Sequence, residues 1–152
     1  MEANNMGVLW VDNDVFNYLC KAGCLEAVLS NAPYTLRTTE LVRNQALAGG
    51  AELRSVIEAI ERGTIMVHLL GTPPLEFAPP KIGRLEPADV SLLLCAQRLG
   101  GQVLTRDKDL IKRCAKDGVG CKPFLEFLDE CDQKGWLDAQ TIEKLRVLCG
   151  EV

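Results

Sequence analysis

Paired carboxylates follow two short apolar runs in this chain. The four acids stand directly after residues 7–11 and 102–105: Asp12, Asp14, Asp107 and Asp109. Each run is short and flanked by glycine or polar residues, which is typical of a buried strand that leads into a helix. Because the carboxyl ends of parallel strands share one edge of a sheet, where ligands bind, we expect these acids to lie together. Such an acidic cluster requires water or a metal ion to neutralise it.

Each of these acids also has a simpler explanation, because aspartate commonly caps the N-terminus of a helix. Asp89 is harder to explain in this way, since a helical wheel places it between Leu93 and Ala96, on the most apolar side of its helix. An unpaired buried charge costs more free energy than the helix dipole returns. We therefore expect Asp89 to face a polar cavity, with Glu86 as an alternative or additional acid. Glu40 stands in the first turn of a helix, and a surface ion pair explains it equally well.

Strands and helices alternate along the chain. The predicted strands lie near residues 7–11, 34–37, 64–70, 102–105 and 119. The predicted helices cover 15–29 with a break near Gly23, then 40–47, 51–61, 87–99, 110–116, 123–133 and 138–149. This alternation predicts an α/β protein in which a central parallel sheet of about five strands lies between two helical layers, an α/β/α fold. Four prolines exclude regular structure from residues 71–83, a segment typical of a functional or partner-binding loop.

Composition fits one globular domain over residues 1–152. The formal net charge of −4 argues against a protein that coats nucleic acid by bulk charge, although residues 104–122 carry six basic and three acidic side chains. The seven cysteines form no Cys-x-x-Cys pair and only one histidine is present, so we expect reduced core thiols rather than a zinc site. No apolar run approaches the roughly 20 residues of a membrane span. The first five residues do not read as a signal peptide, which predicts a cytoplasmic location.

The acids, taken in order, resemble the pattern of the PIN-domain nuclease family over nearly the whole chain. Asp12 lies in Val-Asp-Asn-Asp-Val, and Glu40 lies in Thr-Thr-Glu-Leu-Val. Asp89 lies in Pro-Ala-Asp-Val-Ser, and Asp107 lies in Leu-Thr-Arg-Asp-Lys. The chain departs from the pattern at Asp14, where the family more often has asparagine or serine, and in the proline-rich segment.

The resemblance implies a role for each of these residues. Asp12, Asp89 and Asp107 would be metal ligands, and Glu40 would be a ligand or orient a water molecule. A site of carboxylates without histidine or cysteine suits Mg²⁺ or Mn²⁺. Four residues would support the cluster: Asn13, Asp14, Thr105 and Asp109. Four basic residues would bind substrate phosphates, although a solvated helix face explains them as well: Arg106, Lys108, Lys112 and Arg113.

The function implied by the resemblance is a Mg²⁺- or Mn²⁺-dependent endoribonuclease. Small members of the family are typically VapC-type toxin ribonucleases, which implies a homodimer, an RNA substrate and a cognate antitoxin. A PIN-like domain that only binds RNA or protein is one alternative. A haloacid-dehalogenase-type phosphotransferase is another, because Asp12 and Asp14 mimic its nucleophile motif, but it would leave Asp89 unexplained. A response-regulator receiver fits less well, since residues 65–70 carry no acceptor aspartate.

Overall fold

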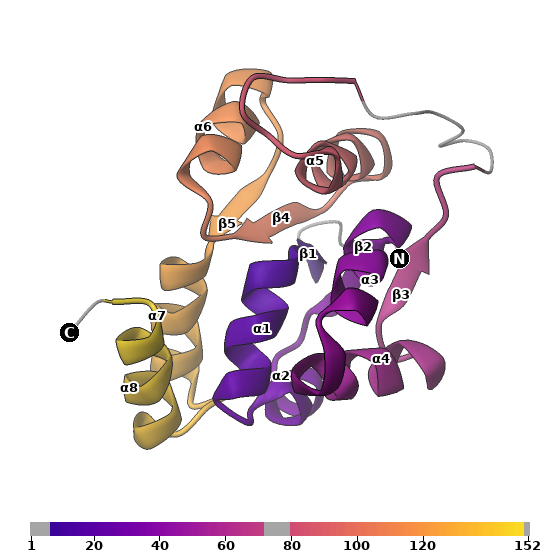
Figure 1. Ribbon diagram of the computed structural model, residues 1–152. Helices are drawn as coiled ribbons and strands as arrows, with labels where there is room; N and C mark the ends of the chain where they lie inside the picture. Colours follow the sequence, from indigo (N-terminus) through magenta and orange to yellow (C-terminus); the bar gives the residue numbers. More distant parts are fainter. Residues whose placement is uncertain (1–6, 72–79, 151–152) are drawn as a thin grey trace, which may run out of the picture.

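The computed structural model describes residues 7–71 and 80–150 of the chain (Figure 1). In these residues the strands are β1 (Val8–Val11), β2 (Thr35–Thr39), β3 (Met66–His68), β4 (Gln102–Thr105) and β5 (Cys121–Pro123). The helices are α1 (Asn13–Lys21), α2 (Leu25–Asn31), α3 (Glu40–Ala48), α4 (Arg54–Glu61), α5 (Pro87–Leu99), α6 (Lys108–Asp117), α7 (Phe124–Lys134) and α8 (Ala139–Leu148), with a 3₁₀ helix, η2, at Gly50–Leu53.

The described strands form one parallel sheet in the order β3-β2-β1-β4-β5. Helices α5 and α6 cover one face of the sheet, and the remaining helices lie on the other face (Figure 1). The predicted three-layer α/β/α fold with a five-stranded parallel sheet is therefore confirmed.

The order of the strands places a switch point between β1 and β4. From β1 the chain moves outward through β2 to β3, and it then returns to the other side of β1 to form β4 and β5. The connections that follow β1 and β4 therefore leave in opposite directions. In open α/β sheets, ligands bind in the crevice that this reversal opens at the carboxyl ends of the strands. The loops that follow β1 and β4 carry Asp12 and Asp107.

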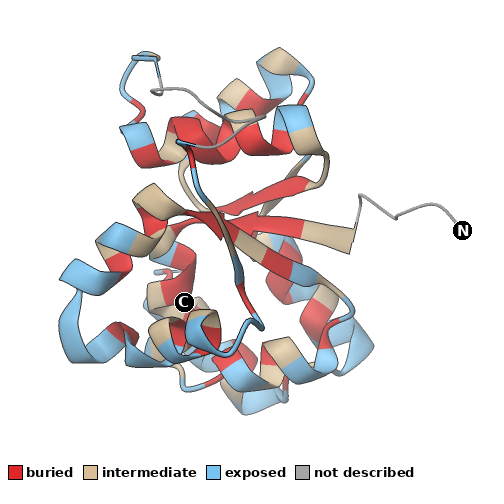
Figure 2. Ribbon diagram, turned by 90° about the vertical axis from the view of Figure 1, so that its right-hand side faces the viewer, coloured by how far each residue is buried: buried red, intermediate tan, exposed pale blue. Residues whose placement is uncertain are grey.

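The central strands β1 and β4 are buried between the two helical layers (Figure 2). Leu9, Trp10 and Val11 of β1 are all fully buried, which explains why the central strand is a continuous apolar run rather than an alternating one. The Nε1–H of Trp10 donates a hydrogen bond of 2.8 Å to the Gly100 carbonyl oxygen. The turn before β4 is thereby tied to β1, so the two strand ends that carry the acids are held in a fixed register.

Several element boundaries differ from the predicted ones. The break between α1 and α2 falls at Gly23, whose φ of +68° suits glycine, as expected. The region 51–61 divides into η2 and α4, and only three residues of 64–70 pair as a strand. Val119 is not in β5: its N–H donates to the Cys114 carbonyl oxygen at 2.9 Å, because Gly118 closes α6 in the left-handed conformation.

The cysteines, the N-terminus and the membrane-spanning character of the chain were also the subject of predictions. Cys95, Cys114 and Cys149 are buried in the core, as expected. The expectation for the N-terminus lies outside the described residues, as does most of the proline-rich segment. No helix in the described part of the chain has the length and apolar character that a membrane crossing requires.

Candidate active site

Asp12 follows the central strand β1 and has two structural duties. It is the N-cap of α1, where its Oδ1 accepts a hydrogen bond of 2.9 Å from the Val15 N–H. Its Oδ2 accepts a hydrogen bond from the hydroxyl group of Thr105, the last residue of β4. The side chain is buried, with only 5% of the residue exposed. Both carboxylate oxygens are therefore fixed in place, one by the backbone of its own helix and one by the neighbouring strand.

Asp107 is joined to Asp12 through Thr105. The Asp107 N–H donates a hydrogen bond of 3.0 Å to the Thr105 Oγ1, which in turn donates to Asp12. Asp107 is the N-cap of α6, and its Oδ1 accepts hydrogen bonds from the N–H groups of Asp109 and Leu110. The capping interpretation and the site interpretation of these acids are therefore compatible, because a capping carboxylate keeps lone pairs for a ligand.

Asp89 lies in the first turn of α5, as the predicted helix over residues 87–99 implied. Its Oδ2 accepts a hydrogen bond of 3.3 Å from the backbone N–H of Glu86, which is the N-cap of the helix. Ser91, two residues later, is fully buried and donates from its hydroxyl group to the Ala88 carbonyl oxygen. The first turn of α5 is thus fixed, and Asp89 faces a polar cavity rather than the apolar core.

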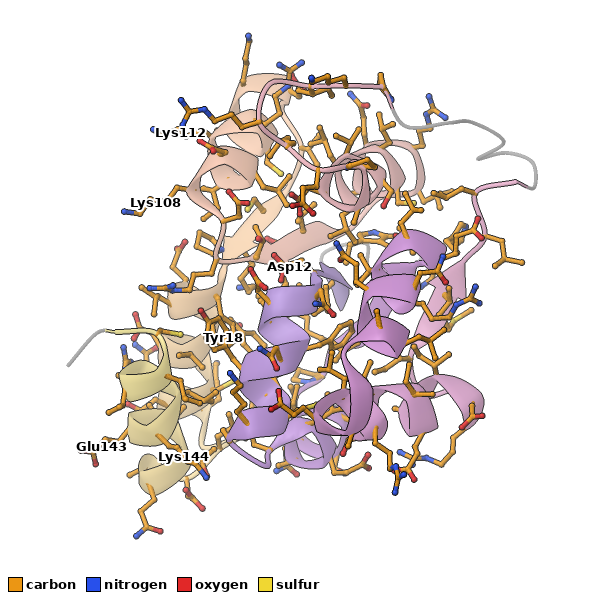
Figure 3. The ribbon with its side chains drawn as sticks, in the orientation of Figure 1. Asp12, Tyr18, Lys108, Lys112, Glu143 and Lys144 are labelled. Atoms are coloured by element: carbon orange, nitrogen blue, oxygen red, sulfur yellow. The ribbon has the colours of Figure 1, made fainter. Side chains whose placement is uncertain are left out.

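That cavity has a volume of about 220 Å³ and lies at the carboxyl edge of the sheet, where Figure 3 shows Asp12. The described residues that line it are Asp12, Asn13, Asp14, Gln45, Arg84, Glu86, Asp89 and Asp107. Five of these side chains are carboxylates, and they come from three separate segments of the chain. We call this space the acidic cavity.

Burial and nearby negative charge raise the pKa of two carboxyl groups of this cavity, those of Asp12 and Asp89. Burial raises the pKa of Asp12 from 3.8 to about 7, and the nearby charges of Asp14 and Asp89 add to the rise, against the hydrogen bonds from Thr105 and Val15. Burial likewise raises the pKa of Asp89 from 3.8 to about 6. A cation in the cavity would relieve both effects, because it favours the charged form of a carboxylate.

The donor chemistry of the acidic cavity fits a hard divalent cation. All of its acids offer oxygen, and the buried Oδ1 of Asn13 accepts no hydrogen bond within the described residues. No three carboxylate, histidine or cysteine side chains in residues 7–71 and 80–150 stand close enough to ligate one ion directly. Mg²⁺ usually binds one or two carboxylates directly and keeps several waters. The cavity therefore fits such an ion with water completing its coordination.

Glu40 is not brought to this cavity, contrary to the sequence-based expectation. It begins α3 at the carboxyl end of β2, but its Oε1 accepts a hydrogen bond from the backbone N–H of Leu70 beyond β3. Glu40 is not among the described residues that line the acidic cavity, whereas Glu86 is. Glu86 therefore occupies the place of a fourth acid in this arrangement, and a role for Glu40 stays a prediction.

Of the four basic residues expected to bind phosphate, two are engaged by other protein groups and two are exposed. Arg106 donates from its guanidinium group to the Cys149 carbonyl oxygen and, at 3.3 Å, to the Tyr18 hydroxyl oxygen, so it anchors the end of α8. Arg113 forms an ion pair of 2.9 Å with Asp117 on its own helix. Lys108 and Lys112 are exposed and project outward from α6 (Figure 3).

Two residues of the cavity wall, Gln45 and Arg84, were not identified from the sequence. The Nε2 of Gln45 lies 3.5 Å from an Oε2 of Glu86 and links α3 to the start of α5. Arg84 is the one cationic residue among those described in the cavity wall. No sequence motif places either residue near the acids, because each lies in a segment that is distant in sequence from the ends of β1 and β4. Asp109, expected to support the cluster, is exposed and does not line the cavity.

A comparison with solved structures agrees with this fold. No protein-family model matches the chain, and no curated protein matches it in sequence. Among solved structures, it is similar to a PilT N-terminus domain protein from the hyperthermophilic archaeon Sulfolobus solfataricus P2. The two chains are 25% identical and superpose with a TM-score of 0.61, over 81% of this chain and 92% of the other. PIN is the short name of the PilT N-terminus domain, so the resemblance found in the sequence is confirmed and the chain has the fold of a PIN-domain protein.

Proposed function

We propose that this protein is a Mg²⁺- or Mn²⁺-dependent endoribonuclease that hydrolyses RNA phosphodiesters in the acidic cavity. The observation that carries the proposal is the gathering of five carboxylates around one small cavity at the switch point of the sheet. The PIN-domain fold supports nuclease activity in general. The choice of metal follows from the all-oxygen donor set.

The residues of the chain have separable duties in this proposal. Asp12, Asp89 and Asp107 would hold the metal directly or through water. The Thr105 hydroxyl group donates a hydrogen bond to Asp12 and accepts one from the Asp107 N–H. Thr105 therefore fixes the position of these two acids relative to each other. The bound ion would supply an activated water for in-line attack and stabilise the charge that develops on the phosphate.

A metal titration tests the proposal. We expect no cleavage of a labelled single-stranded RNA in EDTA, and cleavage that rises and saturates as Mn²⁺ or Mg²⁺ is added. The thermal midpoint of the protein is expected to rise over the same range of metal concentration, because an ion that binds only the folded state stabilises it. Cleavage products are followed on a denaturing gel, with single-stranded DNA of the same sequence as the control substrate.

The same titration separates the alternatives. A rise of the thermal midpoint without cleavage of RNA or DNA would contradict the nuclease proposal and favour the PIN-like binding module. Hydrolysis of phosphate monoesters would favour the haloacid-dehalogenase-type reaction. That reaction has little support here, since no lysine is among the described residues that line the acidic cavity.

We further propose that the enzyme is the toxin of a toxin–antitoxin pair and acts as a homodimer under control of a cognate antitoxin. The support is the resemblance of the chain to small VapC-type proteins. Expression of the wild-type chain in a bacterial host without antitoxin is expected to arrest growth, and expression of Asp12→Asn is not. Equal growth of both cultures at equal protein level would contradict the toxin role.

A further inference from the structure

A second cavity adjoins the acidic cavity and carries the opposite charge. It has a volume of about 380 Å³ and lies between the turn at residues 82–85 and helix α6. The described residues of its wall include four cations and one carboxylate: Arg84, Lys112, Arg113, Lys116 and Asp109. Arg84 lines both cavities, so they meet at this side chain.

The backbone fixes Arg84 at this border. The Leu85 N–H donates a hydrogen bond of 3.0 Å to the Ile82 carbonyl oxygen, which closes a turn around Gly83 and Arg84. Gly83 has a φ of +53°, a conformation that favours glycine. Leu85 is buried in the core, and Glu86 begins the cap of α5 directly after it. The turn is therefore anchored at its carboxyl end, which holds the backbone of Arg84 next to the start of α5.

Helix α6 supplies the other wall. Lys112 and Lys116 are four residues apart, so they lie on one face of the helix, and both are exposed. Within residues 7–71 and 80–150, Arg84, Lys112 and Lys116 form no ion pair, whereas Arg113 is paired with Asp117. We call the three residues Arg84, Lys112 and Lys116 the basic groove.

The opposite side of the α6 N-terminus is less suited to a polyanion. The described lining of a cavity there includes two cations, Arg106 and Lys108, against four in the second cavity. The guanidinium group of Arg106 already donates to Cys149 and Tyr18 and lies 5.9 Å from the centre of the Tyr18 ring. A phosphate would have to compete with these contacts for the Arg106 donors.

We propose that the basic groove binds the phosphodiester backbone of a single nucleic-acid strand and leads it into the acidic cavity past Arg84. The inference rests on the proposed nuclease function, because the strand that occupies the groove is the substrate. It adds a direction: the backbone approaches from the side of residues 82–85 and α6, away from Arg106. The proposed function favours nucleic acid over an acidic peptide, because the phosphodiester that the acidic cavity would cleave belongs to the strand in the groove.

Binding measurements test the groove without requiring turnover. Anisotropy of a labelled single-stranded RNA, and of DNA of the same sequence, is measured in EDTA at several salt concentrations. The triple variant Arg84→Ala/Lys112→Ala/Lys116→Ala is expected to bind at least about 10-fold more weakly than the wild type at low salt. Its slope of log K against log salt should be smaller by about 2, since each phosphate contact of a single strand contributes about 0.7. Weaker binding of RNA alone, with DNA unbound by either protein, would support the groove and identify RNA as its ligand.

A charge-matched control separates a specific groove from net charge. Lys21→Ala/Lys134→Ala/Lys144→Ala removes three exposed lysines from the C-terminal parts of α1, α7 and α8, and Figure 3 shows Lys144 far from Asp12. The control is expected to bind as the wild type does. Equal weakening of both triple variants overturns the proposal, and so does wild-type binding by the groove variant. The proposal is also overturned if the wild type binds polyglutamate but not nucleic acid and the groove variant loses that binding. This result would favour an acidic protein partner.

The failure of this inference differs from the failure of the proposed function. Metal-dependent cleavage with an unchanged kcat/KM in the groove variant would overturn the groove and leave the nuclease intact. Groove-dependent binding of nucleic acid without cleavage at any metal concentration would support the groove and contradict the nuclease.

Discussion

Replacement of Asp12 by asparagine is expected to lower metal-dependent RNA cleavage by more than about 100-fold. Substitution of a residue that only orients a metal ligand typically costs about 10- to 100-fold, so loss of a ligand itself should cost more. The asparagine keeps an oxygen that can accept the Val15 N–H, so the N-cap of α1 is retained. Cleavage rates at saturating Mn²⁺, together with circular dichroism spectra, measure the two effects separately.

Thr105→Val gives the graded comparison. The valine keeps the shape of the side chain but removes the hydroxyl group that joins Asp12 to the Asp107 N–H. Its cleavage rate is expected to fall by about 10- to 100-fold, less than that of Asp12→Asn. Glu143→Gln on α8 removes one exposed carboxylate far from Asp12 (Figure 3) and should cleave as the wild type does. An Asp12→Asn enzyme within threefold of the wild-type rate would reject the acidic cavity as the active site.

The central acids were predictable because the physics that places them is simple. Parallel strands end at a common edge, so Asp12 after β1 and Asp107 after β4 had to meet once the strands were recognised as neighbours. Asp89 was predictable for a different reason, since a carboxylate on the apolar side of a helix requires a polar environment. In each case one short segment contained the whole signal.

The remaining features depend on contacts between distant segments. Glu40 has the right position at the end of β2, but the Leu70 N–H, thirty residues later, binds its carboxylate. Arg106 stands beside Asp107 in sequence, yet the carbonyl of Cys149 engages its guanidinium group. Arg84 reaches the cavity through a turn fixed by Gly83. The spacing of residues in the sequence does not predict such partners, because the donor or acceptor that binds the side chain lies in a distant segment of the chain.

The raised pKa of Asp12 predicts that the metal-free protein loses stability as pH rises. The pKa is 3.8 for the ordinary group and about 7 in the folded protein. Between these values the folded state holds a proton that the unfolded state has released, so the free energy of unfolding falls with rising pH and levels off above pH 7. At about 1.4 kcal/mol for each pH unit, the loss amounts to at most about 4 kcal/mol. Asp89, with its pKa raised to about 6, acts in the same direction.

Urea unfolding of wild type and Asp12→Asn in EDTA, from about pH 5 to about pH 8, measures this effect. Near pH 5 the Asp12 carboxyl is neutral in the folded state but already ionised in the unfolded state, so the wild type should have lost about 1.6 kcal/mol of its stability relative to the variant. Between about pH 5 and about pH 8 the advantage of the variant should grow by about 3 kcal/mol, because the variant contains no charge at this buried position. Saturating Mg²⁺ should narrow the difference by stabilising the wild type alone. A difference in stability that stays constant with pH would show that the pKa of Asp12 is the same in the folded and unfolded states. The acidic cavity would then lack the unfavourable buried negative charge that a bound cation would neutralise.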